Sequence, residues 1–322
     1  MHTFKTLWQA MLMATVTLPL TNGNALGATF SGYAFDSGKI DAAIPGFVGP
    51  DGLGNITGNN QVNPLFVGWA TDYQDYRPAP GVLEQWQTPE QALGEVTGAF
   101  DSIVSLGELT AEQIAAAVMP GQITLTFDRP IQNGEGADFA VFENGFGFAD
   151  TGKLFAELAF VEVSTNGVDF LRFPSLSLTP DPLEPFGQLD PTQVYNLAGK
   201  HVNNGIILPD NQFIQASWGT PFDLEVLTDI AQPSLIDLNS INFVRIVDIP
   251  GNGAFVDSEG RPIYDPWQTT IPGSGGFDLE AVGVINAEAV PEPTSIVALS
   301  LAGVLGVSLR RSSNRAKSSR QV

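Results

Sequence analysis

Short alternating runs broken by glycine and proline are the feature that most limits what this chain can fold into. The 322 residues include 34 glycines and 23 prolines. Between these breakers, apolar residues alternate with other types: in the run 122–127, Ile123, Leu125 and Phe127 fall on one face of a strand. The pattern predicts an all-β domain with many turns.

Further runs have the same character. We expect strands at 138–146, 205–208, 243–249 and 281–285, and a hairpin over 158–173 in which Asn166-Gly167 supplies the positive φ values of the turn. These runs favour a β-sandwich, jelly-roll-like, with long loops. The stretch 28–100 is rich in glycine and asparagine, and we expect it to wrap the sandwich as an irregular portion.

One short helix is predicted in this β-rich chain. Thr110 and Gln113 have the spacing of a capping box, the alanines that follow favour helix, and Pro120-Gly121 ends it. We find no internal repeat of fixed period, which argues against a propeller or solenoid.

The N-terminus is typical of a secretory signal peptide. Lys5 precedes a mostly apolar run, and small residues at Ala25, Gly27 and Ala28 offer a cleavage point. We therefore expect residues 1–27 to be removed on export, which leaves a single domain over 28–290.

The expected mature body is strongly acidic. Residues 28–290 carry thirty-four acidic and eight basic side chains, a formal charge near -26. A surface of this sign repels phosphate, which excludes nucleic acid as a partner, and it suits divalent cations. The sequence has no cysteine, so disulfides, thiol nucleophiles and cysteine-based metal sites are excluded.

The C-terminus has three parts. Val290, Pro291, Glu292 and Pro293 interrupt regular structure, an apolar run covers 296–309, and five basic residues beginning with Arg310 and Arg311 follow. Fourteen helical residues would span about 21 Å, less than the roughly 30 Å hydrocarbon core, so this is a marginal or transient membrane anchor.

This order of motif, apolar run and arginines resembles the PEP-CTERM sorting signal. The resemblance covers residues 290–322 and implies an exosortase as partner, with processing at the surface of a Gram-negative, exopolysaccharide-producing bacterium.

The body is also similar to that of a group of PEP-CTERM proteins known mainly from sequence. The similar segments are GADFAVFENGF (136–146), FAELAFVEVSTNG (155–167), NLAGKH (196–201), GTPFDL (219–224), VRIVDI (244–249) and GGFDLEAVGVI (275–285). This resemblance implies architecture and destination and transfers no active site.

Histidine is nearly absent from the chain. His201 is the one imidazole of the expected mature body, and no G-x-S-x-G stretch supplies a nucleophilic serine. A multi-histidine metal site is therefore excluded. We interpret His201 as a hydrogen-bonded loop residue.

Carboxylates are abundant, and several fall at predicted strand ends. Calcium takes six to eight oxygen ligands, so an acidic, cysteine-free exported domain can use it to tie loops together. Simple surface acidity explains the same residues. The candidate ligands for a structural Ca²⁺ ion are Asp138, Glu143, Glu157, Asp223, Asp248, Asp257 and Asp278.

Aromatic residues give a second candidate site. Trp69, Tyr73, Tyr76 and Trp86 occur close together in a polar stretch, where they could stack on sugar rings or close one end of the sandwich.

The sequence thus predicts an exported, non-catalytic protein of the cell surface or extracellular matrix, structural or associated with exopolysaccharide. The alternative is a carboxylate-dependent glycosidase, which needs two carboxylates roughly 5–10 Å apart.

Overall fold

The computed structural model describes residues 42–50, 54–268 and 275–289. The chain divides into two units, Met1–Glu288 and Ala289–Val322, and nearly all of the described residues belong to the first. The predicted signal peptide (1–27) and the sorting residues from Val290 to Arg311 lie outside the described residues. No helix in the described part combines the length and the apolar content needed to cross a membrane.

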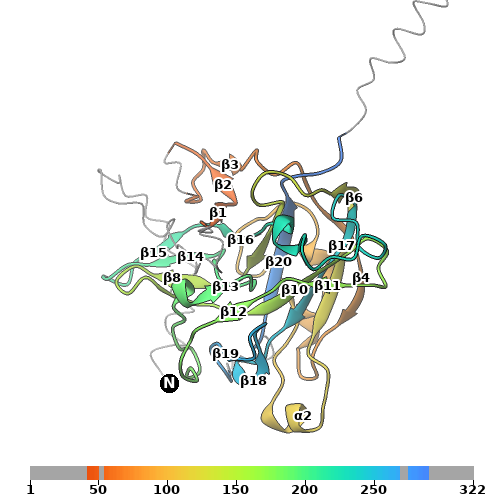
Figure 1. The fold of residues 1–322 in the computed structure, drawn as a ribbon. Helices are drawn as coiled ribbons and strands as arrows, with labels where there is room; N and C mark the ends of the chain where they lie inside the picture. Colours follow the sequence, from red (N-terminus) through yellow and green to blue (C-terminus); the bar gives the residue numbers. More distant parts are fainter. Residues whose placement is uncertain (1–41, 51–53, 269–274, 290–322) are drawn as a thin grey trace, which may run out of the picture. The chain divides into compact units, whose positions relative to one another are not determined.

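A curled antiparallel sheet of ten strands forms the centre of the first unit (Figure 1). The strand order is β1-β16-β7-β20-β4-β6-β17-β10-β11, and β5 pairs with β20. The strands are β1 (Ile44–Pro45), β4 (Gly68–Arg77), β5 (Val104–Ser105), β6 (Gln122–Ile131), β7 (Phe139–Glu143), β10 (Ala159–Ser164), β11 (Leu171–Arg172), β16 (Trp218–Phe222), β17 (Ile241–Asp248) and β20 (Asp278–Val284). The predicted all-β, sandwich-like class is confirmed.

Smaller sheets and short helices complete the unit. One sheet has the order β15-β14-β8-β9, and three are two-stranded: β12-β13, β18-β19 and β2-β3. Their strands are β2 (Phe47–Val48), β3 (Gln61–Val62), β8 (Phe146–Phe148), β9 (Lys153–Phe155), β12 (Leu176–Ser177), β13 (Val194–Tyr195), β14 (Gly205–Ile207), β15 (Phe213–Gln215), β18 (Asn252–Val256) and β19 (Pro262–Tyr264). The helices are α2 (Ala111–Ala115) and the 3-10 turns η1 (Glu84–Trp86), η2 (Pro89–Ala92), η3 (Pro191–Gln193) and η4 (Leu224–Leu227).

Alternation along the strands builds the main core. Ile123 and Leu125 of β6 are fully buried, and Phe127 packs beside them, as the pattern predicts. Val161 of β10 and Val244 of β17 point into the same cluster. Since successive side chains of a strand point to opposite faces, residues 122, 124, 162 and 245 are left for the other face of the sheet.

The predicted hairpin forms, but its turn differs from the expected one. β10 and β11 pair antiparallel, and of the two turn residues only Gly167 has a positive φ, 74°. The Asn166 side chain instead accepts hydrogen bonds from the backbone N–H groups of Val168 and Asp169, at 2.9 Å each. A six-residue loop organised by this amide replaces the tight turn.

The predicted helix is present with its capping box. The Thr110 side chain accepts from the backbone N–H of Gln113, and the Gln113 side chain accepts from the backbone N–H of Thr110.

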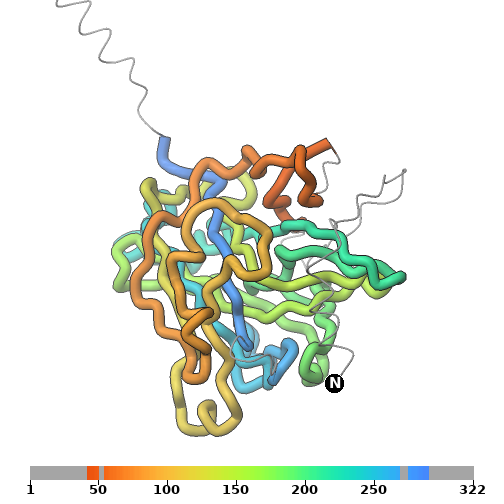
Figure 2. The backbone as a smooth tube through the Cα atoms, turned by 180° about the vertical axis from the view of Figure 1, so that it is seen from behind, coloured from red at the N-terminus to blue at the C-terminus, as the bar shows by residue number. Residues whose placement is uncertain are grey.

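The interpretation of 28–100 as a wrapping portion is wrong for 68–77, because these residues form β4, a central strand between β20 and β6. Viewed from behind, the orange segment after β4 lies beside blue β20 (Figure 2), and Ala92 of η2 is buried in the main core.

Candidate functional site

Four carboxylates lie in the interior at strand ends, three of them where strands of the large sheet begin or end. Glu143 is the last residue of β7, Asp248 the last of β17, and Asp278 the first of β20. Asp265 follows β19. None of the four has more than 7% of its surface exposed. We call these four residues the acid cluster.

Backbone pairing brings the strand ends together. β7 and β20 are antiparallel neighbours, so the end of one meets the start of the other, and the N–H of Asn144 donates to the carbonyl oxygen of Asp278 at 3.0 Å. Oδ1 of Asp248 accepts from the backbone N–H of Phe277 at 2.8 Å. This bond ties the end of β17 to the start of β20.

Glycines make room for two of the carboxylates. A Cβ atom at Gly145 would lie 2.7 Å from Oε2 of Glu143, and one at Gly251 would collide with Oδ1 of Asp265. The other Asp265 oxygen, Oδ2, accepts from the backbone N–H of Leu158 at 2.8 Å. Both carboxylates thus occupy space that is open only because residues 145 and 251 are glycines.

Burial dominates the electrostatics of the acid cluster. It raises the pKa of Glu143 well above the usual range, and the charges of Asp278 and Asp265 raise it further. Burial likewise raises the pKa of Asp248, with contributions from Glu108 and Asp278, and the pKa of Asp265, with contributions from Asp248 and Glu108. It raises the pKa of Asp278 to about 7. Because members raise one another's pKa values, they lie within mutual electrostatic reach.

Several oxygens of the acid cluster accept no hydrogen bond from the described residues. These are both carboxylate oxygens of Glu143, Oδ2 of Asp248 and Oδ1 of Asp278. The backbone N–H of Glu157 lies near enough to Glu143 to lower its pKa, without the geometry of a formed hydrogen bond. The Ser105 hydroxyl and the backbone N–H of Ile249 act in the same way on Asp278 and Asp248. Buried polar atoms are nearly always paired in folded proteins, so each of these oxygens requires an explanation.

Asp138, another predicted calcium ligand, is bonded very differently. It precedes β7, at the opposite end of the strand from Glu143. Its Oδ1 accepts from the backbone N–H of Gly134 at 2.7 Å and from the Asn286 amide at 2.8 Å, and its Oδ2 accepts from the backbone N–H of Leu224 at 2.7 Å. Asp138 therefore organises loops through protein donors.

The remaining predicted ligands also serve local structure. Asp223 caps η4 by accepting from the backbone N–H of Glu225 at 2.9 Å, and Oε1 of Glu157 accepts from the backbone N–H of Gly276 at 2.9 Å. Asp257 accepts from the backbone N–H groups of Ser177, Glu259 and Arg261. Of the seven predicted ligands, the acid cluster contains three: Glu143, Asp248 and Asp278.

Glu280, Lys200 and His201 are also buried. Glu280 accepts from the backbone N–H groups of Thr97 and Gly98, at 2.6 and 2.7 Å, and burial raises its pKa to about 7. Lys200 is fully buried. Burial lowers the pKa of His201, and the charge of Lys200 lowers it further. His201 is therefore neutral at pH 7.

The predicted sugar-stacking aromatics contact different parts of the protein. Trp69 packs against Phe142, with ring centroids 5.9 Å apart, in a cluster separate from the main core. Tyr73 and Tyr76 pack against the main core, and Trp86 lies half-buried in η1. Sugar stacking by these residues stays a prediction.

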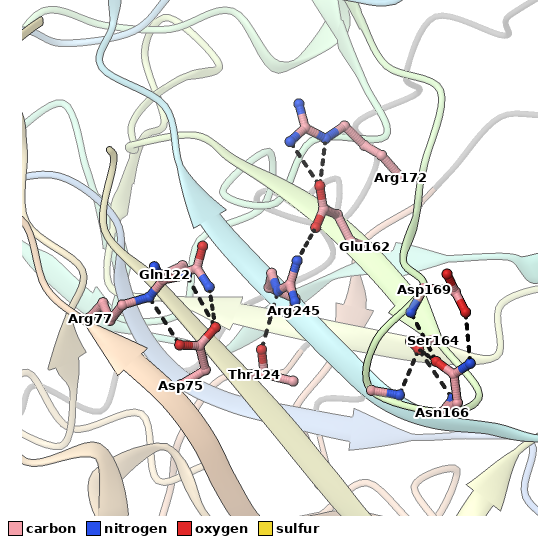
Figure 3. A network of polar contacts seen from close by, with 11 residues as sticks. Asp75, Arg77, Gln122, Thr124, Glu162, Ser164, Asn166, Asp169, Arg172 and Arg245 are labelled. Atoms are coloured by element: carbon pink, nitrogen blue, oxygen red, sulfur yellow. Dashed lines mark hydrogen bonds and ion pairs between the residues drawn. The ribbon is translucent and has the colours of Figure 1, made fainter. Parts of the chain in front are cut away.

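A second candidate site lies on the face of the large sheet opposite the main core. Arg172 of β11, Glu162 of β10 and Arg245 of β17 are cross-strand neighbours, and Figure 3 shows them in a row. Nη2 of Arg172 lies 2.8 Å from Oε1 of Glu162, and Nη1 of Arg245 lies 3.1 Å from Oε2. We call these three residues the arginine–glutamate row. Two guanidinium groups and one carboxylate give it a net positive charge within an acidic protein.

Aromatic rings and a hydroxyl hold the two guanidinium groups in place. Cζ of Arg172 lies 4.0 Å from the ring centroid of Phe160, and Cζ of Arg245 lies 3.4 Å from that of Phe170. Nε of Arg245 also donates to the Thr124 hydroxyl at 3.3 Å. The arginine side chains remain 45% and 22% exposed. The row therefore presents ordered N–H donors to solvent.

Comparison with known proteins found no matching family model and no matching curated relative. The two sites are therefore interpreted from their own chemistry.

Proposed function

We propose that this chain is an exported, non-catalytic protein of a bacterial cell surface or extracellular matrix that associates with polysaccharide. An exosortase would sort it through the signal at 290–322. The sorting part of the proposal is supported by the order of motif, apolar run and basic end in the sequence. The binding part is supported by the arginine–glutamate row.

The chemistry of the row suits sugar hydroxyls. A guanidinium group offers planar, paired N–H donors that can serve two neighbouring hydroxyl oxygens at once, and a carboxylate accepts from hydroxyl donors. The stacked rings of Phe160 and Phe170 limit the motion of the arginines, which lowers the entropic cost of binding. The overall negative charge repels polyanions, so we expect a polysaccharide with few acidic groups.

The binding part is tested with the exopolysaccharide of the producing organism. In a pulldown, Arg172→Ala should weaken binding about tenfold, since losing one charge-assisted hydrogen bond costs roughly 1.5 kcal/mol. Arg261→Ala is the matched control, because Arg261 is also ion-paired and is 40% exposed but belongs to the β18–β19 hairpin. Equal binding by wild type and both Arg172→Ala and Arg245→Ala would overturn this use of the row.

The same incubation separates the alternative function. Release of sugar by the purified protein would instead support a carboxylate-dependent glycosidase, and the non-catalytic proposal would then fail.

The sorting part is tested in cells. Deleting residues 290–322 should release the protein into the medium, and replacing Pro291, Glu292 and Pro293 with alanine should do the same. Retention of both variants at the cell surface would contradict recognition through this signal.

A further inference from the structure

The carboxylate of Glu143 is a buried ionisable group whose environment requires an explanation. It is fully buried, and neither of its oxygens accepts a hydrogen bond from any described residue. An isolated buried carboxylate costs far more than the marginal stability of a protein allows, so it must be neutralised by a proton or by a cation.

The surroundings of Glu143 favour a cation. Asp278 and Asp248 each have one buried carboxylate oxygen that accepts no hydrogen bond from a described residue. Together with Glu143 they supply four such oxygens from the ends of three strands, and carboxylate oxygens are the ligands that hard divalent ions prefer. We propose that Glu143, Asp248 and Asp278 bind a Ca²⁺ ion that ties together the ends of β7, β17 and β20.

Other buried acids lack this property. The oxygens of Asp138 and Asp257 are served by backbone N–H groups, and those of Glu280 by the Thr97–Gly98 segment and the Asn203 amide. A cation at any of these sites would have to displace protein donors. Carboxylate oxygens without hydrogen-bond donors thus distinguish the acid cluster from these other buried acids.

The carboxylates must move to bind the ion. Among the described residues, no three acidic or histidine side chains already form a ligand set. When no cation is present, a proton neutralises each buried carboxylate, and Ca²⁺ would displace these protons on binding. Ca²⁺ would draw the three groups together by rotation of their side chains, with backbone carbonyls and water completing its six to eight ligands.

The inference is tested on the full exported protein, independently of any polysaccharide. After treatment with EDTA and dialysis, calorimetric titration with CaCl₂ should show binding near one ion per chain. Thermal unfolding should shift upward by about 5 °C or more when free Ca²⁺ is about a hundred times its Kd. Absence of both heat and shift at millimolar Ca²⁺ would overturn the proposal.

Two variants locate the ion. Glu143→Gln should bind Ca²⁺ at least about tenfold more weakly and lose most of the thermal shift, while it folds as well as wild type in EDTA. Glu280→Gln is the matched control, because Glu280 is a buried acid whose oxygens are already served, and it should keep the full shift. A normal Ca²⁺ response in Glu143→Gln, or loss of response in both variants, would reject the site.

Discussion

A fully buried carboxylate lies at each end of β7, and the two differ in their hydrogen bonding. Asp138, just before the strand, accepts from two backbone N–H groups and one side-chain amide. Glu143, the last residue of the strand, accepts no hydrogen bond from the described residues. Both side chains have no exposed surface, so burial alone does not separate them.

The difference shows that nearby hydrogen-bond donors determine whether a buried carboxylate stabilises the fold or is available to a ligand. Hydrogen bonds to the carboxylate stabilise its charged form, whereas burial without donors favours a proton or a bound cation. Asp138 is therefore part of the loop structure, and Glu143 remains available for a ligand. Glu280, a buried acid with several donors, and Glu162, an acid paired with two arginines, allow the comparison to be tested in steps.

Asp138→Ala should have the largest effect. It leaves three N–H groups without their acceptor: the buried N–H of Leu224 and the partly buried donors of Gly134 and Asn286. At about 2 kcal/mol for the buried donor and about 1 kcal/mol for each of the others, the change should lower the free energy of unfolding by about 4 kcal/mol. Chemical denaturation measures this loss. Asp150→Ala, at an exposed position, is the control and should change stability by less than about 0.5 kcal/mol. Similar small losses in both variants would remove the structural role of Asp138.

Glu280 should make stability depend on pH. Its pKa of about 7 in the folded protein lies above the ordinary value of 4.5, so its contribution is complete below about pH 4.5 and is lost as the pH rises through 7. The contribution amounts to about 3 kcal/mol. Unfolding in EDTA at pH 4.5 and at pH 8 should therefore show a smaller decrease for Glu280→Gln than for wild type. Identical decreases would show that Glu280 ionises normally.

Glu162→Gln should have an intermediate effect. The Glu162 side chain is 12% exposed and pairs with two arginines. Removing its charge leaves Arg172 and Arg245 close together without a counterion, which should cost about 2 kcal/mol. Since both arginines reach solvent, the loss should stay below that of Asp138→Ala. A double-mutant cycle with Arg172→Ala measures the interaction free energy between Glu162 and Arg172. A coupling energy near zero would mean that the arginine–glutamate row is not held by its ion pairs.

Much of the fold could be predicted from local patterns. Ile123 and Leu125 alternate, Thr110 and Gln113 form a capping box, and each signal needs only nearby residues. The sequence does not predict β4, because polar residues at 71, 72, 74 and 75 obscure its alternation and because two register shifts interrupt its pairing with β6. Such bulges break the period of two on which strand prediction depends.

The candidate sites could be predicted only in part. Glu143, Asp248 and Asp278 were selected because acids at strand ends suit calcium, but the same rule selected Asp138, whose donors come from residues 134, 224 and 286. Which acid finds donors depends on contacts between distant segments, and a single sequence does not contain them. Asp265 joins the acid cluster through such a contact, with Leu158.

Glu143→Met in EDTA should have the smallest effect, and it tests the comparison most directly. The substitution removes no hydrogen bond formed with the described residues and keeps a side chain of similar length, so the free energy of unfolding should stay within about 1 kcal/mol of wild type. Denaturant unfolding with EDTA, and then with Ca²⁺, measures both states. Wild type should gain stability from Ca²⁺ and the variant should not. A loss in EDTA as large as that of Asp138→Ala would mean that protein donors hold both carboxylates, and the two ends of β7 would no longer differ in kind.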